Sequence, residues 1–153
     1  MEIALSEAKK AARVGEVPIG AVIRDDVTDT ILVSTHNKVE QLLDPTAHAE
    51  ILAIREATSV LGTKLLSNCT IFVTLEPCAM CAGALMHARV ARLVIGTREP
   101  RAGVVRSQLG LLDESFFNHR IDIVEGVMRE ECSELLKRFF AQRRAEQTGP
   151  RAP

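Results

Sequence analysis

The chain has 153 residues, a net charge of −1 at pH 7 and an apolar fraction of 46%. These values indicate one globular domain and exclude a strong overall attraction for nucleic acid. No apolar run reaches the roughly 18 residues that cross a bilayer, and the N-terminus lacks the basic segment of a secretory signal. The four cysteines include a C-x-x-C pair, which favours a reduced, metal-binding protein over a disulfide framework. We therefore expect no membrane association and a cytoplasmic location.

The first half of the chain alternates the patterns of helix and strand. Apolar residues at helical spacing predict an amphipathic helix over residues 2–14. Two apolar segments, 17–23 and 31–35, predict strands that pair across an Asp-rich turn. Thr46 is a suitable N-cap for a helix over 47–61.

The second half contains a strand that is apolar on both faces and a loop of unusual length. Residues 70–75 form that strand, and its pattern is typical of the centre of a sheet. Residues 98–120 contain Pro and Gly but little periodicity, and a loop of this length in a compact domain is usually functional. The remaining elements are predicted to be a helix over 78–88, strands over 92–97 and 121–124, and a helix over 128–145.

Strands separated by crossover helices predict an α/β fold. Its sheet would be largely parallel or mixed and covered by helices on both faces. We expect a single domain over residues 1–146, followed by a disordered tail over 147–153.

Three residues in the middle of the chain could hold a zinc ion: His48, Cys78 and Cys81. The two cysteines are three apart at the start of a predicted helix, so they share a face at the end that stabilises thiolates. Three protein ligands leave the fourth tetrahedral position open for water, which is typical of a catalytic zinc site. Glu50, two residues after His48, is then placed to move protons onto and off that water.

The same residues allow other interpretations. A C-x-x-C pair alone could be a redox pair or half of a structural zinc site, and a single His is more often a hydrogen-bonded partner than a ligand. A structural site would need a fourth ligand at short spacing, but Cys69 and Cys132 have the setting of core cysteines. The combination with Glu50 favours the catalytic interpretation.

The segments around these residues resemble a known family. H-A-E at 48–50 followed by P-C-x-x-C at 77–81 is similar to the signature of the zinc-dependent nucleobase deaminases. The resemblance to bacterial tRNA-specific adenosine deaminases is stronger still and spans about residues 2–145. It implies a three-layer α/β/α cytidine deaminase-like fold with a central five-stranded mixed sheet. The matching segments are Glu16–Val22, Asn37, Asp44–Glu50, Thr74–Ala84, Asn118–Arg120 and the last helix through Phe140.

This resemblance implies hydrolytic deamination of adenosine to inosine at the wobble position of a tRNA anticodon. His48, Cys78 and Cys81 would hold one Zn²⁺ per subunit of a homodimer, and Glu50 would shuttle the proton. The alternative is a deaminase of a free nucleobase or nucleoside, of the guanine or cytosine type. A structural zinc or RNA-binding module would leave Glu50 without a role.

Eight further residues are candidates for contact with the substrate, on the resemblance and on local chemistry. Asn37 would contact the target nucleotide near its ribose and base, although an Asn is also common in plain turns. The basic C-terminal end could contact phosphates, and Phe140 could stack on a base because the chain has no Trp or Tyr. The apolar candidates could equally be core residues, and the charged ones solvated surface. The candidates are Val17, Ile19, Asn37, Leu75, Glu99, His119, Phe140 and Arg143.

Overall fold

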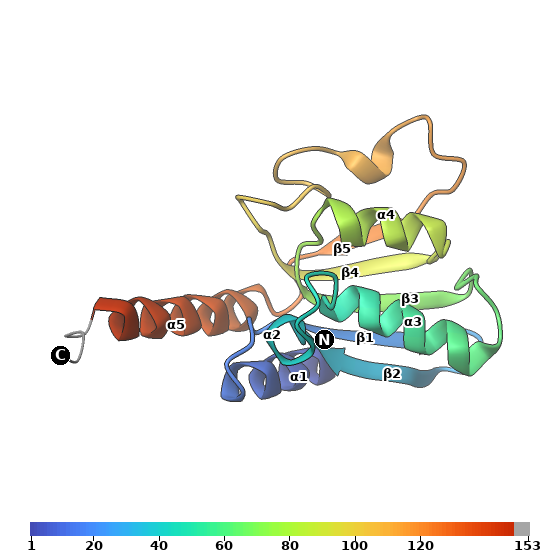
Figure 1. Ribbon diagram of the computed structural model, residues 1–153. Helices are drawn as coiled ribbons and strands as arrows, with labels where there is room; N and C mark the ends of the chain where they lie inside the picture. The colour runs from blue at the N-terminus through green and yellow to red at the C-terminus, as the bar shows by residue number, and fades with distance from the viewer. Residues whose placement is uncertain (149–153) are drawn as a thin grey trace.

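A five-stranded sheet forms the centre of the protein, seen in a computed structural model that describes residues 1–148 (Figure 1). The strand order is β2-β1-β3-β4-β5. β1 runs antiparallel to both of its neighbours, whereas β3, β4 and β5 are parallel. This confirms the mixed sheet. The strands are β1 (Gly20–Asp25), β2 (Thr30–His36), β3 (Cys69–Leu75), β4 (Arg92–Thr97) and β5 (Asp122–Glu125).

Helices cover both faces of the sheet and give the expected three layers (Figure 1). On one face, α3 packs against β1 and β2 and contacts α4; on the other, α1 packs against β1 and β2 and contacts α5. The apolar side chains of β3, the central strand, are buried between the layers, apart from the half-buried Phe72. The helices are α1 (Glu2–Arg13), α2 (Val39–Leu42), α3 (Ala49–Leu61), α4 (Ala79–His87), the 3₁₀ turn η1 (Leu111–Asp113) and α5 (Arg129–Thr148).

Small residues allow α1 to lie directly on the start of β1. Ala4, Ala8 and Ala11 have no exposed surface. A Cβ on Gly20 would lie 1.9 Å from the Ala4 carbonyl oxygen, so only glycine permits this approach. The alanine spacing that predicted the helix therefore also sets its distance from the sheet.

Several predicted boundaries differ from the structure. The strand predicted over 17–23 begins at Gly20, because Ile19 N donates to Val17 O at 2.8 Å in a tight turn. Thr46 is not the N-cap of α3; its hydroxyl donates to Asp44 Oδ1 at 2.7 Å, and His48 occupies the cap position. The short helix α2 had no sequence prediction.

The end of the chain and the long loop complete the fold. α5 extends to Thr148, so residues 147 and 148, predicted to start a disordered tail, are helical. The rest of that predicted tail, 149–153, lies outside the described residues. Residues 98–120 are irregular apart from η1, as expected, but Val105 and Leu112 anchor them in the core. No helix within residues 1–148 is long and apolar enough to cross a membrane.

Candidate active site

Two helix N-termini bring His48, Cys78 and Cys81 together. His48 caps α3, Cys78 caps α4, and Cys81 lies in the first turn of α4. His48 Nδ1 is 3.7 Å from Cys78 Sγ and 3.5 Å from Cys81 Sγ, and the three ligand atoms lie within 4.8 Å of one another. A tetrahedral zinc ion with ordinary Zn–N and Zn–S bonds needs an N···S separation of about 3.6 Å. The observed spacing fits such an ion with one position left open.

The charges at this cluster also suit a cation. The hydrogen bond from the Cys81 thiol, together with His48, lowers the pKa of Cys78 to about 4. Cys78 is therefore a thiolate at neutral pH, the form that binds metals. The positive end of the α4 dipole adds to this stabilisation.

Glu50 lies beside the cluster as a buried carboxylate with an unsatisfied oxygen. The residue is 3% exposed, and within residues 1–148 its Oε2 has no hydrogen-bond partner. Burial raises the pKa of Glu50 above its usual value. A buried carboxylate oxygen without a partner is costly, and its position next to three metal-binding groups makes Glu50 a candidate for proton transfer.

A cavity of about 680 Å³ opens above the cluster, with His48, Glu50 and Cys78 in its lining. It also brings together seven of the eight candidate substrate residues. The eighth, His119, does not line it; its Nε2 donates to Val90 O at 2.8 Å instead. The seven lining residues are Val17, Ile19, Asn37, Leu75, Glu99, Phe140 and Arg143.

Asn37 is held more firmly than a plain turn residue. It is 4% exposed, and its Nδ2 donates to Glu16 Oε2 at 2.9 Å. The other oxygen of the Glu16 carboxylate accepts from Gln41 N at 2.7 Å. The amide of Asn37 therefore has one fixed orientation at the cavity wall.

The last helix contributes a half-exposed aromatic and a tethered cation. Phe140 is 43% exposed and meets Phe139 edge to face, with 5.4 Å between ring centroids. Arg143 Nη2 donates to Gly15 O at 2.8 Å, and its guanidinium lies 5.5 Å from the Phe139 ring centroid. Arg143 thus docks α5 against the segment before β1 as well as facing the cavity.

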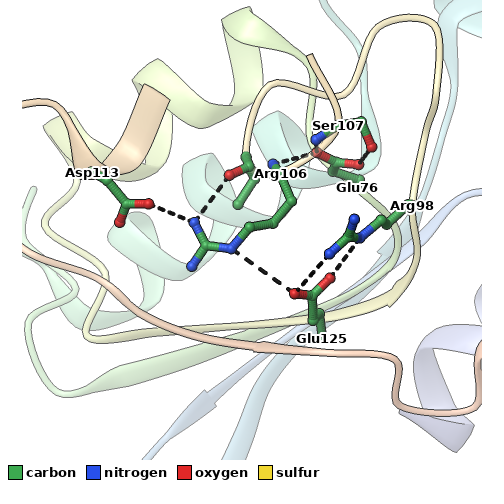
Figure 2. A network of polar contacts seen from close by, with 7 residues as sticks. Glu76, Arg98, Arg106, Ser107, Asp113 and Glu125 are labelled. Carbon is green, nitrogen blue, oxygen red and sulfur yellow. Dashed lines mark hydrogen bonds and ion pairs between the residues drawn. The ribbon is translucent and has the colours of Figure 1, made fainter. Parts of the chain in front are cut away.

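A second buried carboxylate, Glu76, was not among the sequence candidates. It lies two residues before Cys78, and the loop after β4 donates hydrogen bonds to it (Figure 2). Burial alone would raise the pKa of Glu76, but the hydrogen bonds from Ser107 and from backbone N–H groups outweigh it, and the pKa lies below its usual value. Glu16 was missed as well. For Glu76 the one available signal was a charged residue directly after a strand that is apolar on both faces.

Comparisons with known proteins agree with this geometry. Residues 1–144 match the family model of the MafB19-like deaminases. The chain is 44% identical over 151 residues to a tRNA-specific adenosine deaminase of Bacillus subtilis, covering 99% of this chain and 92% of that protein. It is 46% identical over 144 residues to the protein of the same name from Aquifex aeolicus, covering 94% and 93%.

The fold is similar to that of a solved structure. It comes from a study of A-to-I editing by tRNA:A34 deaminases at the wobble position of transfer RNA. The TM-score is 0.85 at 40% sequence identity, and the alignment covers 89% of this chain and 97% of that one.

Proposed function

The chain belongs to the MafB19-like deaminases and, among them, to the tRNA-specific adenosine deaminases, and from this premise we propose that it converts the wobble adenosine of a tRNA anticodon to inosine. The observation that carries the proposal is Glu50, a buried carboxylate with one unsatisfied oxygen, which lines the cavity beside the cluster of His48, Cys78 and Cys81. The alternative of a free-base deaminase is not favoured, because the relatives at 44% and 46% identity are named for tRNA, whereas a guanine deaminase that covers 94% of this chain is 30% identical.

We propose zinc as the metal of this site. One imidazole and two cysteines form a donor set that suits zinc, and the distances between the donor atoms fit a tetrahedral ion. When bound, zinc lowers the pKa of a water molecule from 15.7 toward about 7. His48, Cys78 and Cys81 would hold the ion, and Glu50, which lines the same cavity, would exchange protons with the water without being a ligand.

Glu50 would carry the protons of the reaction. It takes a proton from the attacking water and gives it to a ring nitrogen of adenine as the new C–O bond forms at C6. The Glu50 carboxylate would then take the remaining proton from the hydroxyl group on C6 and give it to the amino group, so that the C–N bond breaks, the C6 carbonyl forms and ammonia leaves. A pKa raised by burial favours this exchange, because the group is then closer to equal acid and base forms near neutral pH.

The cavity suits a nucleoside that is turned out of a single-stranded loop. Its volume of about 680 Å³ is in the range of small-molecule sites, and a loop base can be unstacked at low energy. Val17, Ile19 and Leu75 would form apolar walls for the base, and Asn37 a polar contact. Phe140 and Arg143 would meet the flanking anticodon nucleotides.

The test is a comparison of substrates with zinc-loaded protein. An anticodon stem-loop with adenosine at the wobble position should yield inosine and ammonia, while free adenosine and guanine should react far more slowly. Xanthine from guanine, with no inosine from the RNA, would establish the alternative function.

Glu50→Ala tests the mechanism in the same assay. We expect the variant to keep its zinc and to lose at least about 10²-fold to 10⁴-fold in rate, since general acid–base catalysis contributes that much. Zinc content measured by mass spectrometry separates loss of chemistry from loss of metal. Full activity in this variant would refute the assigned role of Glu50.

We further propose that two copies form a homodimer in the cytoplasm, where tRNA is found. The family resemblance supports this, and exposed apolar side chains such as Leu109 and Phe116 offer surface for an interface. Light scattering at micromolar concentration should give twice the mass of the chain, and the mass of a single chain would contradict the proposal.

A further inference from the structure

The carboxylate of Glu76 is the point to which the loop after β4 is attached. Glu76 is 3% exposed. Its Oε1 accepts from Arg106 N at 2.7 Å and Ser107 N at 2.9 Å, and its Oε2 accepts from the Ser107 hydroxyl (Figure 2). Oε2 also accepts from Glu99 N at 2.9 Å. All four donors belong to residues 98–108, which we term the wall loop. The proton transfer by Glu50 makes no use of Glu76.

Only an ionised carboxylate matches this set of donors. It accepts without donating and has about four lone-pair sites, and the wall loop supplies four donors, three of them backbone N–H groups. An amide in its place would turn an NH₂ group toward at least one backbone N–H. One buried donor would then have no acceptor.

The wall loop folds closely around this carboxylate at Gly103. A Cβ on Gly103 would lie 2.4 Å from Glu76 Cδ and 2.6 Å from Glu99 O. The Gly103 N–H itself donates to Glu99 O at 2.9 Å, and Val104 N donates to Pro77 O at 3.1 Å. A side chain at this position must therefore push the loop and the carboxylate apart.

Other contacts brace the outer side of the wall loop but are more exposed. Arg106 Nη1 lies 2.6 Å from Asp113 Oδ2, and Arg98 Nε donates to Glu125 Oε2 at 2.8 Å (Figure 2). Ion pairs that water can reach contribute little, whereas hydrogen bonds to a buried charge are stronger. Glu76 is therefore the principal anchor.

The anchored loop is also part of the cavity. Glu99 and Ala102 line it together with Glu50 and Cys78. A wall that is ordered before the substrate arrives removes the entropy loss of ordering it on binding. We propose that Glu76 is a positioning residue that holds the wall loop as a preformed side of the substrate cavity; the substrate part of this claim rests on the proposed function.

Two variants disrupt this anchor, one in the wall loop and one at the carboxylate, and a third variant is a matched control. Gly103→Ala introduces the clash from the loop, and Glu76→Gln removes acceptor capacity while it keeps the volume. Gly110→Ala adds the same methyl group further along the segment between β4 and β5, where its nearest neighbour is Asp113 Oδ2 at 3.6 Å, an ordinary contact.

Steady-state kinetics on the anticodon stem-loop measure the substrate part of the proposal. We expect Gly103→Ala and Glu76→Gln to raise KM about tenfold, the value of one strong hydrogen bond. We expect kcat within about threefold of wild type, since Glu50 is untouched, and one zinc per chain. Gly110→Ala should match wild type.

Trypsin cleavage after Arg106, followed by mass spectrometry, measures the anchoring without any reference to activity. The bond that trypsin cuts there joins Arg106 to Ser107, and the Ser107 N–H donates to Glu76. Loss of this hydrogen bond should expose the bond, so cleavage should be at least about tenfold faster in both anchor variants than in wild type. Gly110→Ala should be cleaved at the wild-type rate.

The outcomes separate the two proposals. If cleavage is unchanged in both anchor variants, Glu76 does not hold the loop. Faster cleavage with an unchanged KM would refute the loop's place in the substrate site. Loss of zinc in Glu76→Gln, with normal Gly103→Ala, would show that Glu76 supports the metal site instead. If wild-type protein makes no inosine from RNA, the proposed function fails, and the cleavage rates still decide whether Glu76 is the anchor.

Discussion

A hydrogen bond between two buried side chains, Glu16 and Asn37, sets the polar side of the cavity. Glu16 is 1% exposed, and its carboxylate can only accept, so the end of the Asn37 amide that it contacts must be Nδ2. The Asn37 amide is thereby prevented from flipping. A nucleotide that enters the cavity meets a donor and an acceptor in fixed places.

Glu16→Gln is expected to weaken substrate binding through Asn37. A glutamine at this position keeps the volume but cannot accept from both Asn37 Nδ2 and Gln41 N. We expect kcat/KM for the stem-loop to fall about tenfold, the scale of a hydrogen bond to a charged group.

A double-mutant cycle with Asn37→Ala isolates this coupling. If Glu16 acts through the amide, Glu16→Gln should have almost no effect once Asn37 is alanine. The same tenfold loss in both backgrounds would show a general structural role. Melting temperatures of the four proteins control for stability.

At the residue scale, sequence reasoning identified the groups whose spacing is local. Cys78 and Cys81 are three apart at the start of a helix, which places them on one face, and His48 and Glu50 are only two apart in the sequence. Glu16 and Glu76 were missed because backbone N–H groups distant in sequence account for most of their donors, and a sequence does not display those groups. The resemblance predicted that His119 contacts the substrate. In the structure its side chain donates to the carbonyl oxygen of Val90, just before β4.

At the scale of elements, α5 is tied to the opposite end of the chain. Arg143 Nη2 donates to Gly15 O, where the backbone has a φ of +81° that favours glycine. The next residue is Glu16, whose carboxylate accepts the hydrogen bond from Asn37 Nδ2. The position of α5 and the orientation of Asn37 therefore depend on one short segment.

Arg143→Ala is expected to weaken RNA binding more than loss of an ordinary surface arginine. It removes a hydrogen bond, the contact with the Phe139 ring and a positive charge at the cavity. We expect affinity for the stem-loop to fall about tenfold, and the slope of log affinity against log salt to decrease by about 1. Binding is best measured in Glu50→Ala, which cannot turn over the substrate.

Arg138→Ala is the matched control for this measurement. Its side chain is 79% exposed and pairs only weakly with Glu134, at 3.8 Å on the same helix. This change should alter affinity less than about twofold, because such pairs contribute about 0.3–0.5 kcal/mol. Equal effects of the two substitutions would mean that α5 offers only diffuse charge.

Element types followed from periodicity, while their ends depended on contacts that no pattern records. The alternating order of helices and strands was predicted, because β3 is apolar on both faces and the helices show one apolar side. The start of β1 was misplaced by three residues, since Gly20 and not Val17 is the first residue opposite β2. The short helix α2 has no buried residue and hence no apolar pattern to reveal it.

At the scale of the whole molecule, the metal cluster joins two covering helices at one end of the sheet. α3 comes after β2 and the short α2, α4 comes after β3, and the N-termini of α3 and α4 meet at His48, Cys78 and Cys81. The Cys78 thiolate lies close enough to Glu50 to help raise the pKa of that carboxyl group. A cation bound by the cluster would offset these charges, so we expect metal binding and global stability to be linked.

Removal of the metal should lower the melting temperature of the entire domain. A ligand present at about 100 times its dissociation constant stabilises a protein by about 2.7 kcal/mol, which corresponds to about 5–10 °C for a chain of this size. Scanning calorimetry after chelation and after return of zinc measures the shift. Glu50→Ala keeps all three ligands and should show the same dependence on zinc, whereas Cys81→Ala should show almost none. An identical melting temperature for wild-type protein with and without zinc would mean that the cluster does not bind the ion. Cys69 and Cys132 are buried elsewhere in the core. A zinc effect that Cys81→Ala abolishes therefore cannot come from these other cysteines.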